Sequence, residues 1–192
     1  ATIGRRQAPA AVRANSSNQT VSATFHLVQT DNQTLDHTSI ILNEQHTPAY
    51  EINADLEKMI GSMSVYTIYN GYNLAYNALS PTNAAEQIPI GYVVPTVGEY
   101  TWALDESSNI EDVEHIYLID YETSAITDLV TDVYTFTASE QKSDTRFAIN
   151  VTLKSKESTV TGLVNINKDS EQSLKFIHND KIYILHNGVI YD

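Results

Sequence analysis

A carboxylate, an imidazole and a hydroxyl lie within four positions of one another at Asp36, His37 and Ser39. These residue types make up the triad of serine hydrolases, in which the histidine takes the proton of the attacking hydroxyl. A triad is normally assembled from separate segments, however, and the sequence holds no nucleophile elbow, Gly-rich phosphate loop or His-Glu-x-x-His pair. We therefore predict that the chain is not an enzyme and has no catalytic residues.

Metal chemistry has one candidate, the acidic stretch at residues 105–114. Calcium prefers roughly six to eight oxygen ligands, and this stretch offers five carboxylates with Asn and Ser oxygens between two predicted strands. The candidate ligands are Asp105, Glu106, Glu111 and Asp112. A solvated loop that keeps an acidic protein soluble explains the same residues without a metal, so calcium is an option and no cofactor is required. The histidines are scattered and cysteine is absent, so a zinc site is not expected.

Tyrosine is unusually frequent, with 12 tyrosines against four phenylalanines, and ten of the tyrosines lie between positions 50 and 134. Aromatic rings pack on the apolar faces of sugars while hydroxyls hydrogen-bond to them, so a row of exposed rings could bind a glycan. The candidate platform consists of Tyr72, Tyr92, Tyr100 and Trp102. The alternative is structural, because Tyr is a good strand residue that buries its ring and keeps its hydroxyl hydrated.

The 192-residue chain has a formal charge of −13, which argues against a nucleic-acid partner because that affinity comes mainly from Lys and Arg. Residues 1–20 hold three arginines and no acid, residues 21–141 hold 18 acids and one base, and residues 142–192 hold seven bases and six acids. We predict a basic leader or linker at residues 1–20, an acidic domain at 21–156 and a small C-terminal part at 157–192. No segment approaches the roughly 20 apolar residues of a membrane-spanning helix, so no membrane span is expected.

The elements that must position these groups are short segments rich in Val, Ile, Thr, Tyr and Phe, separated by Asn, Asp, Gly, Ser or Pro. Some of them alternate apolar and polar side chains, which is typical of half-buried antiparallel strands. Room remains only for a turn or short helix near residues 53–60 and 123–129. The predicted fold is all-β, an antiparallel β-sandwich of the jelly-roll or immunoglobulin-like kind. Its predicted strands are residues 21–30, 38–42, 65–69, 74–79, 88–94, 98–104, 115–120, 133–138, 146–153, 160–166, 174–178, 181–186 and 189–191.

Two Asn-Gly pairs predict tight β-hairpins, because Asn and Gly tolerate the positive φ angles of a type I′ turn. Asn70-Gly71 joins two predicted strands in the middle of the chain, and Asn187-Gly188 joins the last two. With a weaker turn at residues 179–180, the last strands form a small C-terminal β-meander. The meander stops directly after a strand, so we expect either an edge strand there or continuation in a longer chain.

Nine segments of the acidic domain follow one another in a characteristic order: 38–44 (TSIILNE), 50–59 (YEINADLEKM), 71–79 (GYNLAYNAL), 88–92 (IPIGY), 98–101 (GEYT), 116–123 (IYLIDYET), 127–129 (TDL), 134–138 (YTFTA) and 144–147 (DTRF). In this order, residues 34–153 resemble a β-sandwich module of Bacteroidetes surface and secreted proteins. Such modules often precede a C-terminal sorting region for type IX secretion. The tail at 181–192 (KIYILHNGVIYD) resembles the start of that region, which usually continues with a short Gly-containing strand.

The resemblance implies a protein that is secreted or displayed on the exterior of the outer membrane, with a structural or adhesive role and no chemistry of its own. The implied partners are surface glycans, other surface proteins and neighbouring domains of a longer chain. Without cysteine, a chain exported through an oxidising compartment must be held together by burial alone. Two alternatives stay open: a carbohydrate-binding module that uses the Tyr/Trp platform, and the accessory region of a larger secreted enzyme.

Three charged residues in the matched segments have structural interpretations. Asp120 follows a predicted strand and is expected to end it by accepting backbone N–H groups in an Asx-type turn. Arg146 is the only arginine outside the leader, and so acidic a domain favours its pairing with a carboxylate. The predicted partners are Asp144 and Asp120, in an architectural role.

Overall fold

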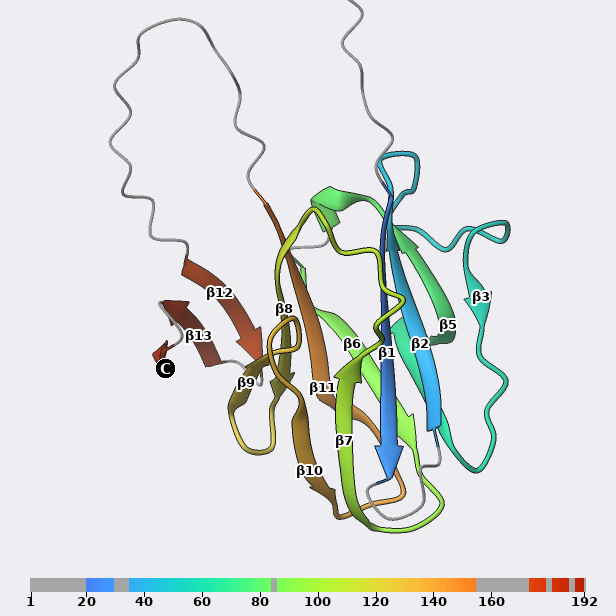
Figure 1. Ribbon diagram of the computed structural model, residues 1–192, viewed down its shortest axis with the longest axis vertical. Coiled ribbons are helices and arrows are strands. Elements are labelled where there is room, and N and C mark those ends of the chain that lie inside the picture. Colours follow the sequence, from blue (N-terminus) through green and yellow to red (C-terminus); the bar gives the residue numbers. More distant parts are fainter. Residues whose placement is uncertain are drawn as a thin grey trace, which may run out of the picture.

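The computed structural model describes residues 20–29, 35–83 and 86–154, and the backbone of three further strands between residues 173 and 191 (Figure 1). The described chain is almost entirely β-structure, with one short 3-10 helix, η1 (Pro81–Asn83). Segments rich in Val, Ile, Thr and Tyr form the strands because these side chains fit a pleated, half-buried surface. The strands are β1 (Val21–Gln29), β2 (Leu35–Leu42), β3 (Leu56–Glu57), β4 (Ser64–Tyr69), β5 (Tyr72–Leu79), β6 (Ile88–Val93), β7 (Gly98–Leu104), β8 (Val113–Asp120), β9 (Ala125–Asp128), β10 (Tyr134–Ala138), β11 (Lys142–Leu153), β12 (Ser173–His178), β13 (Lys181–His186) and β14 (Val189–Tyr191).

Strands β1 to β11 form one mixed sheet in the order β10-β7-β1-β2-β5-β4-β6-β11-β8-β9, with β3 added to β5. Its pairs are antiparallel except β2 and β5, where residues 39–42 lie parallel to residues 76–79. The chain between β2 and β5 contains β3 and β4, which supplies the long crossover that a parallel pair requires. The sheet curls until β10 approaches the β8–β9 hairpin, so the fold is nearly closed and barrel-like (Figure 1). The predicted all-β fold is confirmed, whereas a purely antiparallel sandwich of two sheets is not.

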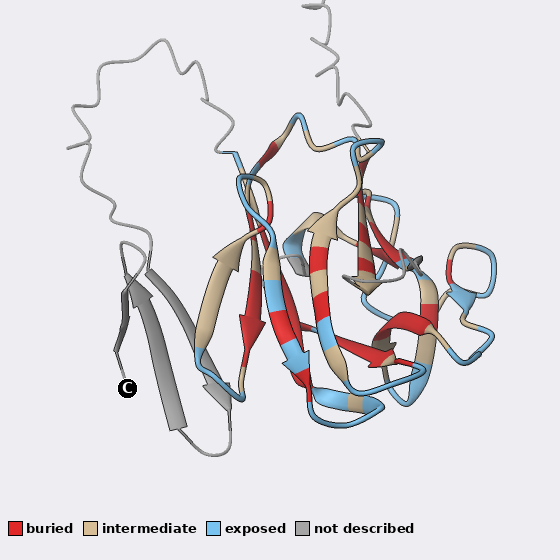
Figure 2. Cartoon of the chain, turned by 60° about the horizontal axis from the view of Figure 1, so that its bottom comes forward, coloured by how far each residue is buried: buried red, intermediate tan, exposed pale blue. Residues whose placement is uncertain are grey.

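The core lies inside the curled sheet and is rich in aromatic rings. In β1 every second side chain from the first to the seventh is buried, as the alternation predicts (Figure 2). Rings from β7 and β10 pack on rings from β6 and β11: Trp102 and Phe147 have centroids 5.7 Å apart, and Tyr92 and Phe136 have centroids 5.6 Å apart. Burial of these large rings is the main favourable term in the stability of the fold.

The turn at Asn70-Gly71 has the predicted conformation. Asn70 and Gly71 have φ angles of 47° and 86°, and Tyr69 pairs with Tyr72 across them. Neither of the two regions where a turn or short helix was expected contains a helix. Residues 53–60 contain a turn followed by the edge strand β3, and residues 123–129 contain β9.

Strands β12, β13 and β14 form a separate antiparallel sheet in that order, which is the predicted C-terminal meander. His178 pairs with Lys181, and His186 pairs with both Ser173 and Val189. The turn residues at 179–180 and 187–188 and nearly all of the predicted leader lie outside the described residues. Within the described residues, no helix has the length and apolar character needed to cross a membrane.

Candidate functional site

A bulge in β11 shapes the site. Between its pairings at Ser143 and Phe147, β11 has three residues, 144–146, where the facing strand β6 has only Gly91. Extra residues of this kind bend a strand and change the direction of its side chains. Here the bulge directs Arg146 inwards beside Phe147, and both side chains are buried.

Gly91 is needed opposite the bulge because the ring of Tyr66 lies directly over it. A Cβ atom at position 91 would meet Tyr66 Cε2 at 2.5 Å and Asp144 Oδ1 at 3.0 Å. The Tyr66 hydroxyl donates to Asp144 Oδ1 at 2.5 Å, and burial together with this carboxylate raises the pKa of Tyr66. Asp144 is exposed and pairs with Lys142 Nζ at 2.8 Å. The structure therefore pairs Asp144 with Lys142 and not with Arg146, the predicted partner, because the bulge directs Arg146 to the interior.

The guanidinium of Arg146 lies at the seam, defined here as the place where β10 meets β8 and β11. Its Nε and Nη2 groups donate to the two carboxylate oxygens of Asp120 at 3.1 and 2.8 Å, which is a bidentate pair. Nη1 donates to the backbone oxygen of Thr137 in β10 at 2.9 Å and pairs with Glu122 Oε2 at 2.6 Å. The cation also lies 4.7 Å from the centroid of the Phe136 ring. The structure thus brings Arg146 and Asp120 together as predicted and links the two ends of the sheet through them.

Asp120 is the buried anion of the seam. Its Oδ1 accepts the backbone N–H of Glu122 at 2.9 Å, which is the predicted Asx turn at the end of β8, and its Oδ2 accepts the Tyr134 hydroxyl at 2.8 Å. Burial raises the pKa of Asp120, but the hydrogen bonds from Arg146, Tyr134 and the Glu122 backbone outweigh burial and hold the pKa below its usual range. Asp120 therefore stays ionised in the fold and neutralises Arg146.

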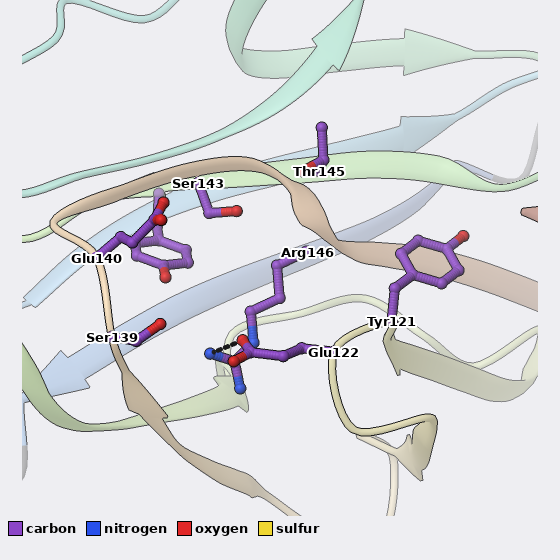
Figure 3. Close-up of a pocket in the computed structure, with 8 residues that line it drawn as sticks. Tyr121, Glu122, Ser139, Glu140, Ser143, Thr145 and Arg146 are labelled. Carbon is purple, nitrogen blue, oxygen red and sulfur yellow. Dashed lines mark ion pairs between the residues drawn. The ribbon is translucent and has the colours of Figure 1, made fainter. Parts of the chain in front are cut away.

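A pocket of about 280 Å³ opens above this network (Figure 3). Four elements converge on it: β6, the β8–β9 turn, the β10–β11 turn and the β11 bulge. We call it the seam pocket, and its lining residues are Tyr92, Tyr121, Glu122, Ser139, Glu140, Ser143, Thr145 and Arg146. Figure 3 shows Glu140 and Tyr121 on opposite sides of Arg146, with Arg146 directed at Glu122.

The seam pocket offers hydrogen-bond acceptors and hydroxyl groups, and its one cation is already paired. Within the described chain, Ser139, Ser143 and Thr145 have no hydrogen-bond partner for their hydroxyls, and neither has the carboxylate of Glu140. Glu122 uses only one carboxylate oxygen on Arg146. No histidine lines the pocket, so it does not contain a Ser–His pair.

The predicted aromatic platform is not formed. Tyr92, Tyr100 and Trp102 are each at most 1% exposed and belong to the core, while Tyr72 is 42% exposed. In β7, Tyr100 and Trp102 alternate with polar or small residues and share one face, and the curled sheet turns that face inwards. Tyr72 stacks on Tyr50 instead, with ring centroids 4.6 Å apart.

The predicted calcium ligands are not brought together. Asp105 accepts the side-chain hydroxyl and the backbone N–H of Ser107, and these bonds lower its pKa. Glu106 and Glu111 are exposed and Asp112 is partly exposed. In the part of the chain that the structure describes, no three His, Asp or Glu side chains converge into a group that could hold a metal ion.

The hydroxyl, imidazole and carboxylate at residues 36–39 are also separated by the fold. Asp36 binds Lys58 Nζ at 2.6 Å and the backbone N–H of Val65 at 2.7 Å, while the Ser39 hydroxyl bonds to that of Thr24. Asp36 and Ser39 fall on opposite faces of β2 because successive strand residues alternate.

Sequence reasoning identified Arg146 and Asp120 of the seam and named Tyr92, which lines the pocket, but it missed the other lining residues. Glu122, Ser139, Glu140, Ser143 and Thr145 lie in turns and in the bulge, where no periodic pattern marks them. The only usable signal was the lone arginine in an acidic domain.

Comparison with known proteins gives a family and no function. Searches of curated proteins and of solved structures found no match. A family profile described as a domain of unknown function, DUF8693, matches residues 13–151, which is well over half of the chain and includes the whole seam. The chain therefore belongs to the DUF8693 family.

Proposed function

We propose that this chain is a non-catalytic structural or adhesive module of a secreted or surface-displayed bacterial protein. The observation that carries the proposal is the use of Arg146, whose guanidinium is committed to Asp120, Glu122 and the backbone oxygen of Thr137. A catalytic or anion-binding arginine directs N–H groups at its ligand. The guanidinium of Arg146 instead joins the two ends of the sheet, which is an architectural role.

One flank of the protein supports a role in contact with other molecules. Large apolar side chains are exposed on or beside β3 and β5, and Leu56 pairs there with Tyr76. Clusters of exposed apolar residues on soluble domains mark interaction surfaces. We call this surface the apolar flank, and its residues are Ile52, Leu56, Met59, Ile60, Tyr72 and Tyr76.

The proposed location rests on the resemblance to Bacteroidetes β-sandwich modules that precede type IX sorting regions. A cysteine-free domain with an aromatic core and an ion-paired seam suits export, because burial and the seam hold it together without disulfides. In this role the curled sheet acts as a sandwich-like scaffold, since rings of β7 and β10 face rings of β6 and β11. The same properties suit the accessory region of a larger secreted enzyme, in which another domain carries the chemistry.

Two measurements test the proposal. The purified full chain is assayed against esterase, peptidase and glycosidase substrates, and intact producing cells are treated with protease to test whether the chain is accessible from outside. We expect no turnover and protease accessibility or release into the medium. Turnover that a point substitution in this chain abolishes, or confinement to the cytoplasm, would overturn the proposal.

Adhesion is tested with surfaces coated with the purified chain, to which producing cells should attach. The double variant Ile52→Ser, Met59→Ser removes the two most exposed members of the apolar flank, at 80% and 93% exposure, and should reduce attachment. Val133→Ser is the matched control, because Val133 is 53% exposed but lies away from that flank, directly before β10. Equal attachment to uncoated and coated surfaces would remove the adhesive role.

A further inference from the structure

We propose that the seam pocket binds a single neutral sugar ring through Glu140, the second oxygen of Glu122 and the hydroxyls of Ser139 and Ser143. The inference rests on the proposed adhesive function and deepens it by naming the chemical class of ligand. It places sugar recognition at turns and a bulge next to Tyr92, and not at Tyr72, Tyr100 or Trp102 of the expected platform.

The charges of the seam pocket exclude an anionic ligand. Arg146 already donates to Asp120 and the Thr137 backbone oxygen and pairs with Glu122, so nearly all of its N–H groups have internal acceptors. Glu122 and Glu140 would repel a phosphate, a sulfate or an acidic sugar at the mouth. A ligand must therefore be neutral or cationic and must bring hydrogen-bond donors.

A sugar matches the free side chains better than a cation does. Each sugar hydroxyl can donate to a carboxylate in a strong charge-assisted bond and can also accept from a protein hydroxyl. An ammonium group only donates, so it would leave the O–H groups of Ser139, Ser143 and Thr145 without an acceptor. The mixture of carboxylates and hydroxyls on the pocket wall thus favours a polyhydroxylated ligand.

The dimensions of the pocket favour one ring over a chain of sugars. Its volume of about 280 Å³ lies just below the roughly 300–1,000 Å³ of pockets that hold drug-sized ligands. The ring of Tyr121, which is only partly buried, supplies apolar surface for the C–H face of a sugar (Figure 3).

The wall is also held in place before a ligand arrives. Glu122 is fixed by its 2.6 Å pair with Arg146, and the hydroxyl of Tyr121 is fixed by its 2.7 Å bond to Gln87 Oε1. Pre-organised groups lose little conformational entropy on binding, which matters most for a small ligand with few contacts. The ion-pair seam thus supports the pocket as well as the fold.

The test is a titration of the full chain, labelled with nitrogen-15, with glucose, galactose, mannose and N-acetylglucosamine, followed by amide chemical shifts. A single ring should bind with a Kd of about 1 mM or weaker, so ligand is added to tens of millimolar. We expect at least one sugar to shift amides of residues 121–122 and 139–146 and few others. Glu140→Gln and Ser143→Ala should each weaken that sugar at least about fivefold.

Glu44→Gln is the matched control, because it makes the same chemical change at an exposed glutamate outside the pocket and should leave the affinity unchanged. The amide spectrum of each variant also reports whether it is folded. No shifts with any of the sugars, or pocket shifts with putrescine and none with sugars, would overturn the inference. Equal affinity in Glu140→Gln would do so as well.

The two proposals fail in different ways. If cells attach to surfaces coated with the chain but no sugar changes the amide chemical shifts, the pocket inference is wrong and the adhesive function is still supported. Sugar-dependent shifts without attachment would support the pocket and count against the adhesive function.

Discussion

Replacing Asp120 by Asn should strongly destabilise the fold through the Arg146 pair. The Asp120 and Arg146 side chains are only 1% and 7% exposed, and the carboxylate accepts bonds from Arg146, Tyr134 and the Glu122 backbone. Removing one partner of a buried ion pair typically destabilises a protein by about 3–5 kcal/mol, because an uncompensated charge stays buried. Arg146 keeps Glu122 and the Thr137 backbone oxygen, so we expect the lower end, about 3 kcal/mol.

Urea unfolding of wild type and Asp120→Asn measures this loss. The variant should unfold at a lower midpoint urea concentration, with an unchanged dependence of the unfolding free energy on urea concentration. For a domain of this size, about 3 kcal/mol should lower the Tm by about 10 °C. Glu122→Gln is the matched control, because that carboxylate binds the same guanidinium but is 54% exposed. An exposed partner should contribute less than about 1 kcal/mol.

The same substitution should change how stability depends on pH. The pKa of Asp120 is lower in the fold than in the unfolded chain, so its contribution is complete above the unfolded pKa of about 3.9 and is lost as pH falls through the lower folded value. Wild type should therefore lose stability below about pH 4 more steeply than Asp120→Asn. If the variant stays within about 1 kcal/mol of wild type at pH 7, the seam does not carry the stability assigned to it.

Three further predictions concern local geometry. Gly91→Ala should destabilise by about 1–3 kcal/mol, because its Cβ would meet the Tyr66 ring at 2.5 Å, whereas Gly61→Ala, with its nearest atom at 3.7 Å, should change the unfolding midpoint little. Gly71→Ala should lower the free energy of unfolding by about 1 kcal/mol in the same urea assay, because φ at Gly71 is 86°. An unchanged unfolding midpoint would contradict the type I′ assignment. Burial raises the pKa of Tyr121 to about 12, so ultraviolet titration should show a late phenolate step that Tyr121→Phe lacks. The contribution of Tyr121 to the free energy of unfolding is fully present below its unfolded pKa of about 10. It is lost as the pH rises through its folded pKa of about 12.

The strands and the central hairpin were predictable because local rules decide them. Apolar and polar side chains alternate in residues 134–138, and the structure buries Phe136 and Ala138 and exposes the two threonines. Asn70-Gly71 predicted its turn because few other pairs accept two positive φ angles in succession. Asp120 at the end of β8 was predictable for a similar reason, since its side chain bonds to a backbone group only two residues away.

Features that depend on distant pairing could not be read from the sequence. The parallel contact of β2 with β5 and the bulge opposite Gly91 follow from which strands meet, and no local pattern encodes that choice. The aromatic platform failed for a related reason. Tyr100 and Trp102 share one face of a strand whether that face is inside or outside, and only the closure of the sheet decides which it is.

The scarcity of bases in the acidic domain has a structural explanation. Lys58 Nζ donates to the His37 backbone oxygen, Arg146 donates to that of Thr137, and Lys154 Nζ donates to that of Glu111. The carbonyls of His37 and Thr137 lie in strands and that of Glu111 lies in the turn before β8, and each is satisfied by a side chain. In residues 20–154, as far as the structure describes them, the remaining base, Lys142, pairs with Asp144. The described bases are thus occupied within the fold, and the charged side chains left to partners are carboxylates. The charge distribution from which no nucleic-acid partner is expected also suits the neutral, hydroxyl-bearing ligand proposed for the seam pocket.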